Sequence, residues 1–265
     1  MKTATPRQAR PESLPKTPTG IDGLDDITGG GFPSGRPTLI CGSAGCGLTL
    51  LAMEFLVRGA TKFGEPGVFM AFEETAEELA QNAKSLGFDL NDLVKRKLLA
   101  VDFVRVERHE IQETGEYDLE GLFVRLAHAI DAVGAKRVVI DMIETLFSGL
   151  SNAAILRSEI RRLLCWLKDR GVTAIITGER GEEAFTRLGL EENLEITDVD
   201  ISSLVDTWVL LRDIEVGGER NRALYILKSR GMSHSNQLRE FLLADHGFEL
   251  LDVSLGPPRG CAQHP

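Results

Sequence analysis

The 265-residue sequence lacks any apolar run long enough to cross a membrane. A span needs about 18–20 such residues, and Met1 is not followed by the apolar core of a signal peptide. Basic residues are also outnumbered, because 30 Lys and Arg stand against 40 Asp and Glu and leave a formal net charge of −10. Binding to a nucleic-acid backbone needs a concentrated basic face. We therefore expect a cytoplasmic protein with neither membrane nor nucleic acid as a partner.

Cysteine is scarce, with residues only at Cys41, Cys46, Cys165 and Cys261. No CxxC pair occurs, and no His lies at ligand spacing from any of the four. This pattern argues against a structural zinc site and against a disulfide framework. We expect reduced thiols, as is usual inside cells.

Proline is missing between Gly67 and Gly256, although four of the ten prolines lie in the first 18 residues and three in the last nine. The first 16 residues carry four basic side chains against one acidic one. With 43% hydrophobic residues, the remainder can build a sizeable core. We predict a flexible basic arm over residues 1–16, one folded domain over 17–255 and a loose tail over 256–265.

Apolar segments with strand and helix periods alternate through the first two thirds of the chain. We expect strands over 38–41, 67–72, 98–104, 136–141 and 172–177, and helices over 49–62, 75–86, 119–133 and 154–170. This βαβα order is typical of an α/β protein with a mostly parallel, doubly wound sheet that is covered on both faces.

The last quarter of the sequence changes character. Strand patterns at 207–212, 222–228 and 240–244 follow one another without a helix between them. Gly217-Gly218 would make a hairpin turn between the first two. We therefore predict that C-terminal antiparallel strands extend the parallel sheet.

The segment GSAGCGLT at 42–49 follows a predicted strand and opens a predicted helix. Three glycines allow successive backbone N–H groups to surround a polyphosphate, and the helix N-terminus adds its positive dipole end. Thr49 stands where the hydroxyl of a P-loop would bind Mg²⁺, but Leu48 stands where the GxxxxGK[ST] signature has lysine. Taken alone, the segment is also compatible with an ordinary glycine-rich turn.

Acidic residues end two of the predicted strands. Asp141 follows KRVVI, as a Walker B aspartate would, and Glu73 and Glu74 follow GVFMAF. Because parallel strands end at one edge of a sheet, these carboxylates are expected beside the glycine loop. Glu73 could then act as a general base toward water or a hydroxyl. The alternative is that Glu73 and Glu74 merely begin a helix.

Four stretches together resemble the KaiC family of RecA-like ATPases. They are TGIDGLDDITGGGFPSG, GSAGCGLT, EPGVFMAFEET and LKSRGMSH, and the likeness runs from about Thr17 to Leu255. The resemblance implies a RecA-like P-loop NTPase that binds ATP and Mg²⁺ between the subunits of a hexameric ring. It also implies regulatory protein partners of the circadian-clock type. Many family members carry two such domains in tandem, whereas this chain has one.

The resemblance implies roles for individual residues. Glu73 matches the catalytic glutamate, with Glu74 beside it, and Thr49, Glu73 and Asp141 would lie at the metal. The phosphate loop would comprise Ser43, Ala44, Gly45, Cys46, Gly47, Leu48, Thr49 and Leu50, and Ser85 would lie near the adenosine. The segment reaching the neighbouring subunit's nucleotide would include Arg222, Lys228, Ser229, Arg230, Met232, His234 and Asp245. Without the resemblance, Lys228 and Arg230 would simply charge the end of a sheet, and His234 would be a surface residue.

The segment ITDVDISS at 196–203 resembles the phosphorylation segment of the family's second repeat. Ser202 and Ser203 match the hydroxyl residues that are phosphorylated there, and Thr197 matches a nearby threonine. Residues before this segment resemble the first repeat instead. Serine/threonine autokinase activity is therefore one expectation, and ordinary turn residues are the other.

Leu48 separates the possible functions. Loss of a hydrogen bond to a charged group costs about 1.5–3 kcal/mol, or roughly 10- to 100-fold in affinity. The first hypothesis is an ATPase of the KaiC type with weakened turnover. The second is a nucleotide-binding regulatory or scaffold ring that has lost hydrolysis. A RecA-like DNA motor is disfavoured by the acidic charge balance.

Overall fold

The computed structural model describes residues 14–105, 119–146, 153–179, 204–216, 219–230, 234–235 and 237–254. Its main sheet is built from nine strands. They are β3 (Pro37–Gly42), β4 (Gly67–Ala71), β5 (Leu99–Phe103), β6 (Arg137–Asp141), β7 (Thr173–Glu179), β8 (Thr207–Val216), β9 (Glu219–Ser229), β10 (Arg239–Ala244) and β11 (Gly247–Ser254). Two short strands, β1 (Lys16–Thr17) and β2 (Phe32–Pro33), pair separately.

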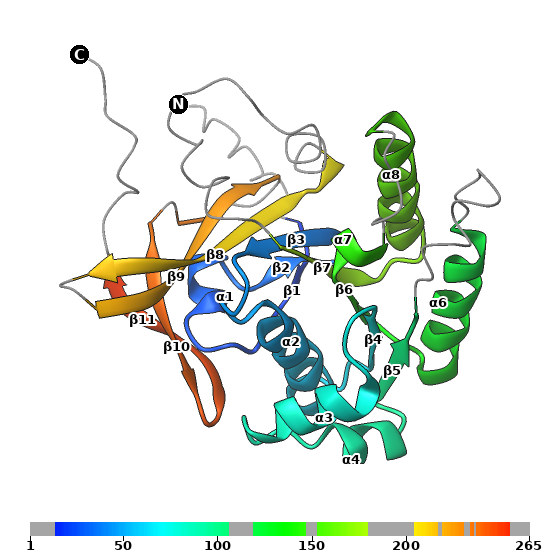
Figure 1. Cartoon of the computed structure of the whole chain (residues 1–265), viewed down its shortest axis with the longest axis horizontal. Coiled ribbons are helices and arrows are strands. Elements are labelled where there is room, and N and C mark those ends of the chain that lie inside the picture. The colour runs from blue at the N-terminus through cyan, green and yellow to red at the C-terminus, as the bar shows by residue number, and fades with distance from the viewer. Residues whose placement is uncertain are drawn as a thin grey trace, which may run out of the picture.

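The strand order in the main sheet is β11-β10-β9-β8-β3-β7-β6-β4-β5 (Figure 1). The strands from β8 to β5 in this order are parallel, and β8, β9, β10 and β11 pair antiparallel. The glycine loop follows β3, which lies between β8 and β7 near the middle of the sheet. The chain thus places the loop where the ends of several parallel strands converge, the usual position of a ligand site in such sheets.

Helices cover both faces of the parallel part (Figure 1). One layer contains α2 (Leu48–Lys62), α3 (Ala76–Lys84) and α4 (Leu90–Lys95), with the short α1 (Leu24–Ile27) nearby. The other contains α6 (Glu120–Val133), α7 (Ile143–Leu146) and α8 (Ala153–Asp169). Each layer encloses its own hydrophobic core against the sheet.

Alternation along β3 explains why there are two cores. Ile40 points into the core beneath α2, whereas Leu39 and Cys41 point into the core beneath α6 and α8. Successive side chains of a strand point to opposite faces, so a central strand with both faces covered buries its side chains on both sides and is mostly apolar. All six residues of β3 are buried accordingly.

The fold predicted from the sequence is confirmed: an α/β architecture with a mostly parallel sheet and C-terminal antiparallel strands. Each predicted strand and helix is present within a few residues of its expected ends. The short helices and the strands β1, β2 and β11 were not predicted, and the expected turn at Gly217-Gly218 lies outside the described residues. Lys16, the last residue of the predicted arm, belongs to β1. In the part of the chain that is described, no helix is both long and apolar enough to cross a membrane.

Candidate functional site

The segment between β3 and α2 forms a tight loop that depends on glycine. Gly45 and Gly47 adopt positive φ angles of 77° and 101°, which residues with a Cβ rarely tolerate. A Cβ on Gly42 would lie 2.4 Å from the Sγ of Cys46, and one on Gly47 would lie 2.9 Å from the Phe248 ring. Gly47 caps α2 and has no side chain of its own to offer the N–H groups of the first helical turn.

A cavity of about 460 Å³ opens above this loop. Among the residues predicted to bind nucleotide, its lining includes Ser43, Ala44, Gly45, Gly47, Leu48, Thr49, Leu50 and Ser85. Glu73 and Glu74 line it as well. Cys46 is the member of the predicted loop that does not, because its side chain is buried against Gly42. The structure therefore brings the loop and the strand-end carboxylates to one concave site.

Asp141 lies under the loop at the end of β6 and is only 6% exposed. Its carboxylate accepts hydrogen bonds from Thr49, at 3.1 Å, and from Thr177 on β7. Burial raises the pKa of Asp141 from 3.8 to about 6, and repulsion from Glu74 and Glu73 adds to the rise. The two threonine hydroxyls act in the opposite direction and lower it. The pairing of Thr49 with Asp141 is the geometry expected of the hydroxyl and carboxylate that hold a magnesium ion in P-loop proteins.

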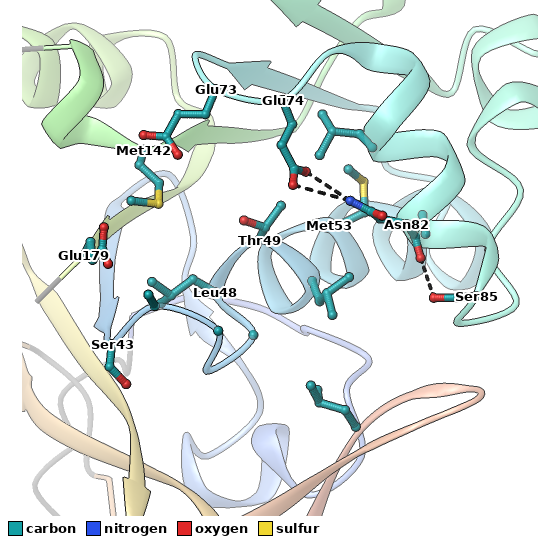
Figure 2. A pocket seen from close by; sticks show the side chains of 17 residues that line it. Ser43, Leu48, Thr49, Met53, Glu73, Glu74, Asn82, Ser85, Met142 and Glu179 are labelled. Carbon is teal, nitrogen blue, oxygen red and sulfur yellow. Dashed lines mark hydrogen bonds between the residues drawn. The ribbon is translucent and has the colours of Figure 1, made fainter.

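Glu73 and Glu74 point into the cavity (Figure 2). Glu73 accepts a hydrogen bond from Thr145 of α7, and Glu74 accepts long contacts of 3.4 Å from the Asn82 amide. The start of α3 is capped instead by Thr75, whose hydroxyl accepts the N–H of Glu78. The two glutamates are thus not needed to cap the helix, and they face the site.

Leu48 lies in the same cavity as the glutamates, although it is only 6% exposed. Figure 2 shows Leu48, Met142 and Glu179 on one side of Thr49, and Asn82 and Ser85 on the other. None of the described residues that line the cavity is Lys, Arg or His. An apolar side chain therefore stands where the lysine was expected. No other described residue of the lining supplies the missing positive charge.

None of the described C-terminal residues that were predicted to bind nucleotide lines the cavity of this chain. Lys228 Nζ donates to the Val205 carbonyl at 3.0 Å, and the backbone N–H of Arg230 donates to Asp206. Burial lowers the pKa of Lys228, and the nearby Arg230 lowers it further. Neither residue lines the cavity of its own chain.

The other C-terminal residues are spread along the antiparallel strands. Ser229 exchanges a hydrogen bond with Thr207, and Arg222 pairs across the ladder with Asp213, whose carboxylate lies 3.5 Å from Ser43 Oγ. Asp245 lies in the β10–β11 turn, close to Gly87 in the segment that follows α3. His234 is described but is not among the lining residues. Met232, Thr197, Ser202 and Ser203 lie outside the described residues.

Several lining residues were not predicted from the sequence. Glu179 ends β7, so the rule that strand ends meet at the ligand site would have found it. Met142 directly follows Asp141 and could have been found in the same way. Leu243 comes from β10, in the antiparallel part, and no pattern in the sequence links it to the loop.

A parallel sheet with a glycine loop between a central strand and a helix, and a carboxylate beneath that loop, defines a RecA-like P-loop NTPase domain. A family model described as "ATPase: KaiC" matches residues 17–253. The chain belongs to the KaiC family of ATPases.

Curated relatives agree with this assignment. The chain is 52% identical to the "Circadian clock protein KaiC2" of Synechocystis sp., over 91% of this chain and 41% of the relative. It is 38% identical to the "Circadian clock oscillator protein KaiC" of Parathermosynechococcus lividus and 37% identical to that of Synechococcus elongatus, over 91% of this chain in both cases and 43% and 45% of the relatives. The chain therefore spans less than half the length of these relatives.

The raised pKa of Asp141 predicts how stability depends on pH without ligand. Because the folded state holds a proton that the unfolded state releases between about pH 4 and 6, this residue lowers stability as pH rises through that range. Asp141→Asn removes the cost of burying an ionised carboxylate and should raise the free energy of unfolding by roughly 2–3 kcal/mol at pH 8. Most of this gain should be absent at pH 4.5. Urea unfolding in EDTA measures the free energy of unfolding at both pH values.

The exposed Glu77 of α3 provides the control for this measurement. Glu77→Gln should change stability little at either pH, because Glu77 is exposed and does not line the cavity. An Asp141→Asn protein that is equally stable or less stable than the parent at pH 8 would contradict the assigned burial cost.

Proposed function

We propose that this chain binds ATP with Mg²⁺ in the loop cavity and hydrolyses it slowly, as a KaiC-type ATPase domain weakened by Leu48. The observation that carries the proposal is the hydrogen bond between Thr49 and the buried Asp141, beneath a glycine loop and opposite Glu73. Family membership supports the choice of ATP.

The donor set fits magnesium. The described residues contain no group of three or more His, Cys, Asp or Glu side chains able to hold a metal ion. Mg²⁺ in nucleotide sites commonly takes only one or two protein ligands and completes its shell with phosphate oxygens and water. Thr49 would ligate it and Asp141 would hold a coordinated water or the ion itself. When bound, the ion would neutralise phosphate charge during transfer.

The remaining roles fall to residues of the cavity. The N–H groups of the loop and of the first turn of α2 would hold the phosphates. Glu73, oriented by Thr145, would accept the proton of the attacking water. Asn82 and Ser85 lie on the other side of Thr49 from Glu73 (Figure 2), where the nucleoside would lie, and Leu243 also lines the cavity. The reaction consumes water and releases ADP and phosphate.

A hydrolysis-deficient nucleotide-binding ring is the second candidate. Leu48 favours it, since the lysine of a P-loop normally contacts the β- and γ-phosphates in both ground and transition states. Autokinase activity at Ser202, Ser203 or Thr197 would use the same Glu73 as base and the serine or threonine hydroxyl in place of water. Because relatives are named as circadian clock proteins, we include a role in a clock-type regulatory system in the proposal.

The test is to compare the parent with Leu48→Lys. The lysine should increase MgATP affinity by about 10- to 100-fold through a charged hydrogen bond, and turnover should rise at least as much. Calorimetry measures binding and phosphate release measures turnover. Failure of both proteins to bind MgATP at millimolar concentration would contradict the proposed function, and binding without turnover in both would favour the scaffold ring.

Loss of the general base is examined in the Leu48→Lys background, where turnover is easier to measure. Adding Glu73→Gln there should lower kcat by about 10²- to 10⁴-fold, because general-base catalysis contributes that much. MgATP affinity should change little. Glu77→Gln in the same background is the matched control. An unchanged kcat would give the role to another carboxylate, and loss of MgATP binding would make Glu73 a metal-supporting residue.

We also propose assembly into a hexameric ring. Lys228 and Arg230 lie away from the cavity of their own chain, as residues that serve a neighbouring subunit's nucleotide would. Nucleotide bound between subunits would stabilise the ring by mass action. Light scattering with saturating MgATP should give about six times the 29.0 kDa chain mass. A mass of one chain under these conditions would contradict ring assembly.

A further inference from the structure

A buried carboxylate lies behind the wall of the loop cavity. Glu54 of α2 is fully buried and does not line the cavity, although its neighbour Met53 does. Its Oε2 accepts the backbone N–H of Phe248 at 2.6 Å, and its Oε1 accepts Arg58 Nε at 3.0 Å. An ionised carboxylate suits two donors, because both of its oxygens are acceptors. Glu54 therefore fastens the hairpin formed by β10 and β11 to α2.

Phe248, the residue that Glu54 holds, packs against the glycine loop. A Cβ on Gly47 would lie 2.9 Å from the Phe248 ring and 3.4 Å from the Leu243 side chain. Leu243 is paired with Phe248 across the hairpin, and it lines the cavity. The rings of Phe241 and Phe248 stack with their centroids 4.9 Å apart, which further restricts where Phe248 can lie. A shift of Phe248 would therefore move one wall of the cavity and remove a contact with the loop.

Arg58 extends this connection to a second wall of the cavity. Its Nη2 donates to the His246 carbonyl in the turn of the hairpin at 2.6 Å. Its guanidinium also lies over the Phe88 ring, 5.4 Å from the centroid. Phe88 belongs to the segment that follows α3 and begins with Ser85, which lines the cavity. Through Arg58, Glu54 thus connects α2 with both the hairpin turn and this segment.

We propose that Glu54 is a positioning residue for nucleotide binding, which holds the hairpin against the loop without touching the nucleotide. This inference rests on the proposed function, because it assumes that the cavity takes a magnesium nucleotide. Glutamine has nearly the same shape as glutamate but offers one acceptor oxygen and an NH₂ group that only donates. In Glu54→Gln, either Phe248 N–H or Arg58 Nε loses its acceptor, and the hairpin is docked for a smaller fraction of the time. The apparent affinity falls in proportion to that fraction.

The effect should fall on binding and not on the chemical step. The hairpin contributes to the cavity wall, whereas Glu73 accepts its hydrogen bond from Thr145 of α7, a separate element. The test uses the full chain with Leu48→Lys, calorimetry for MgADP and phosphate release for MgATP turnover. Adding Glu54→Gln should raise the Kd for MgADP and the KM for MgATP about threefold or more. The kcat should change by less than about twofold.

Two further variants in the same background separate positioning from lost stability. Leu163→Ala is the control, because Leu163 is fully buried in the core beneath α6 and α8, on the other face of the sheet from α2. It should lower stability in urea but leave the Kd for MgADP unchanged where the protein is folded. Gly247→Ala disturbs the same contact from the hairpin, since its Cβ would collide with the Glu54 carboxylate. It should raise the Kd as well, and its effect combined with Glu54→Gln should be less than additive.

The outcomes separate this inference from the proposed function. If Glu54→Gln binds MgADP as tightly as its Leu48→Lys parent, the positioning role is overturned and the nucleotide site stands. An equal loss of affinity in Leu163→Ala also overturns the role, because affinity would then follow global stability. A fall in kcat with KM unchanged overturns it as well. If the Leu48→Lys parent itself binds no MgADP, the proposed function fails and this inference fails with it.

Discussion

Helix α2 is buried on nearly every side. The positions of the loop, the sheet and the C-terminal hairpin, formed by β10 and β11, follow from that burial. Ten of its 15 residues are buried, and it contacts strands from both the parallel and the antiparallel parts of the sheet. Gly59 is required because the fully buried Arg137 crosses the helix there, and a Cβ would lie 2.5 Å from the Arg137 Cδ. With both β3 and α2 held in the core, the five-residue loop between them has little freedom to change its path.

The same helix carries a buried charge that attaches the C-terminal hairpin. The carboxylate of Glu54 is fully buried and accepts the Phe248 N–H at 2.6 Å and Arg58 Nε at 3.0 Å, while Arg58 also donates to the His246 carbonyl. Burial raises the pKa of Glu54, and these donors oppose the rise. A buried carboxylate without partners would be costly, so the hairpin must dock where it does. Docking brings Leu243 to the wall of the cavity.

Leu48 is best understood within this packing. It begins α2 and packs with the hydrophobic core on that side of the sheet, and it also lines the cavity. The loop keeps the backbone shape of a phosphate site, because that shape depends on Gly45 and Gly47 and on the buried elements on either side. What changes is the charge of the site, since Glu73, Glu74 and Glu179 remain without a lysine among them. Shape and charge are therefore separable in this domain.

The sequence by itself determined the order of strands and helices, the glycine loop and the approximate place of Glu73 and Asp141. Each of these depends on local patterns: apolar periodicity, glycine spacing and an acid at a strand end. Only the tertiary structure decided that Cys46 turns away from the cavity, that Leu243 enters it, and that Lys228 and Arg230 lie outside it. Those facts depend on the neighbours of each strand in the sheet and on how the hairpin packs against α2. Long-range contacts of this kind produce no periodic pattern of residues that could be recognised in the sequence.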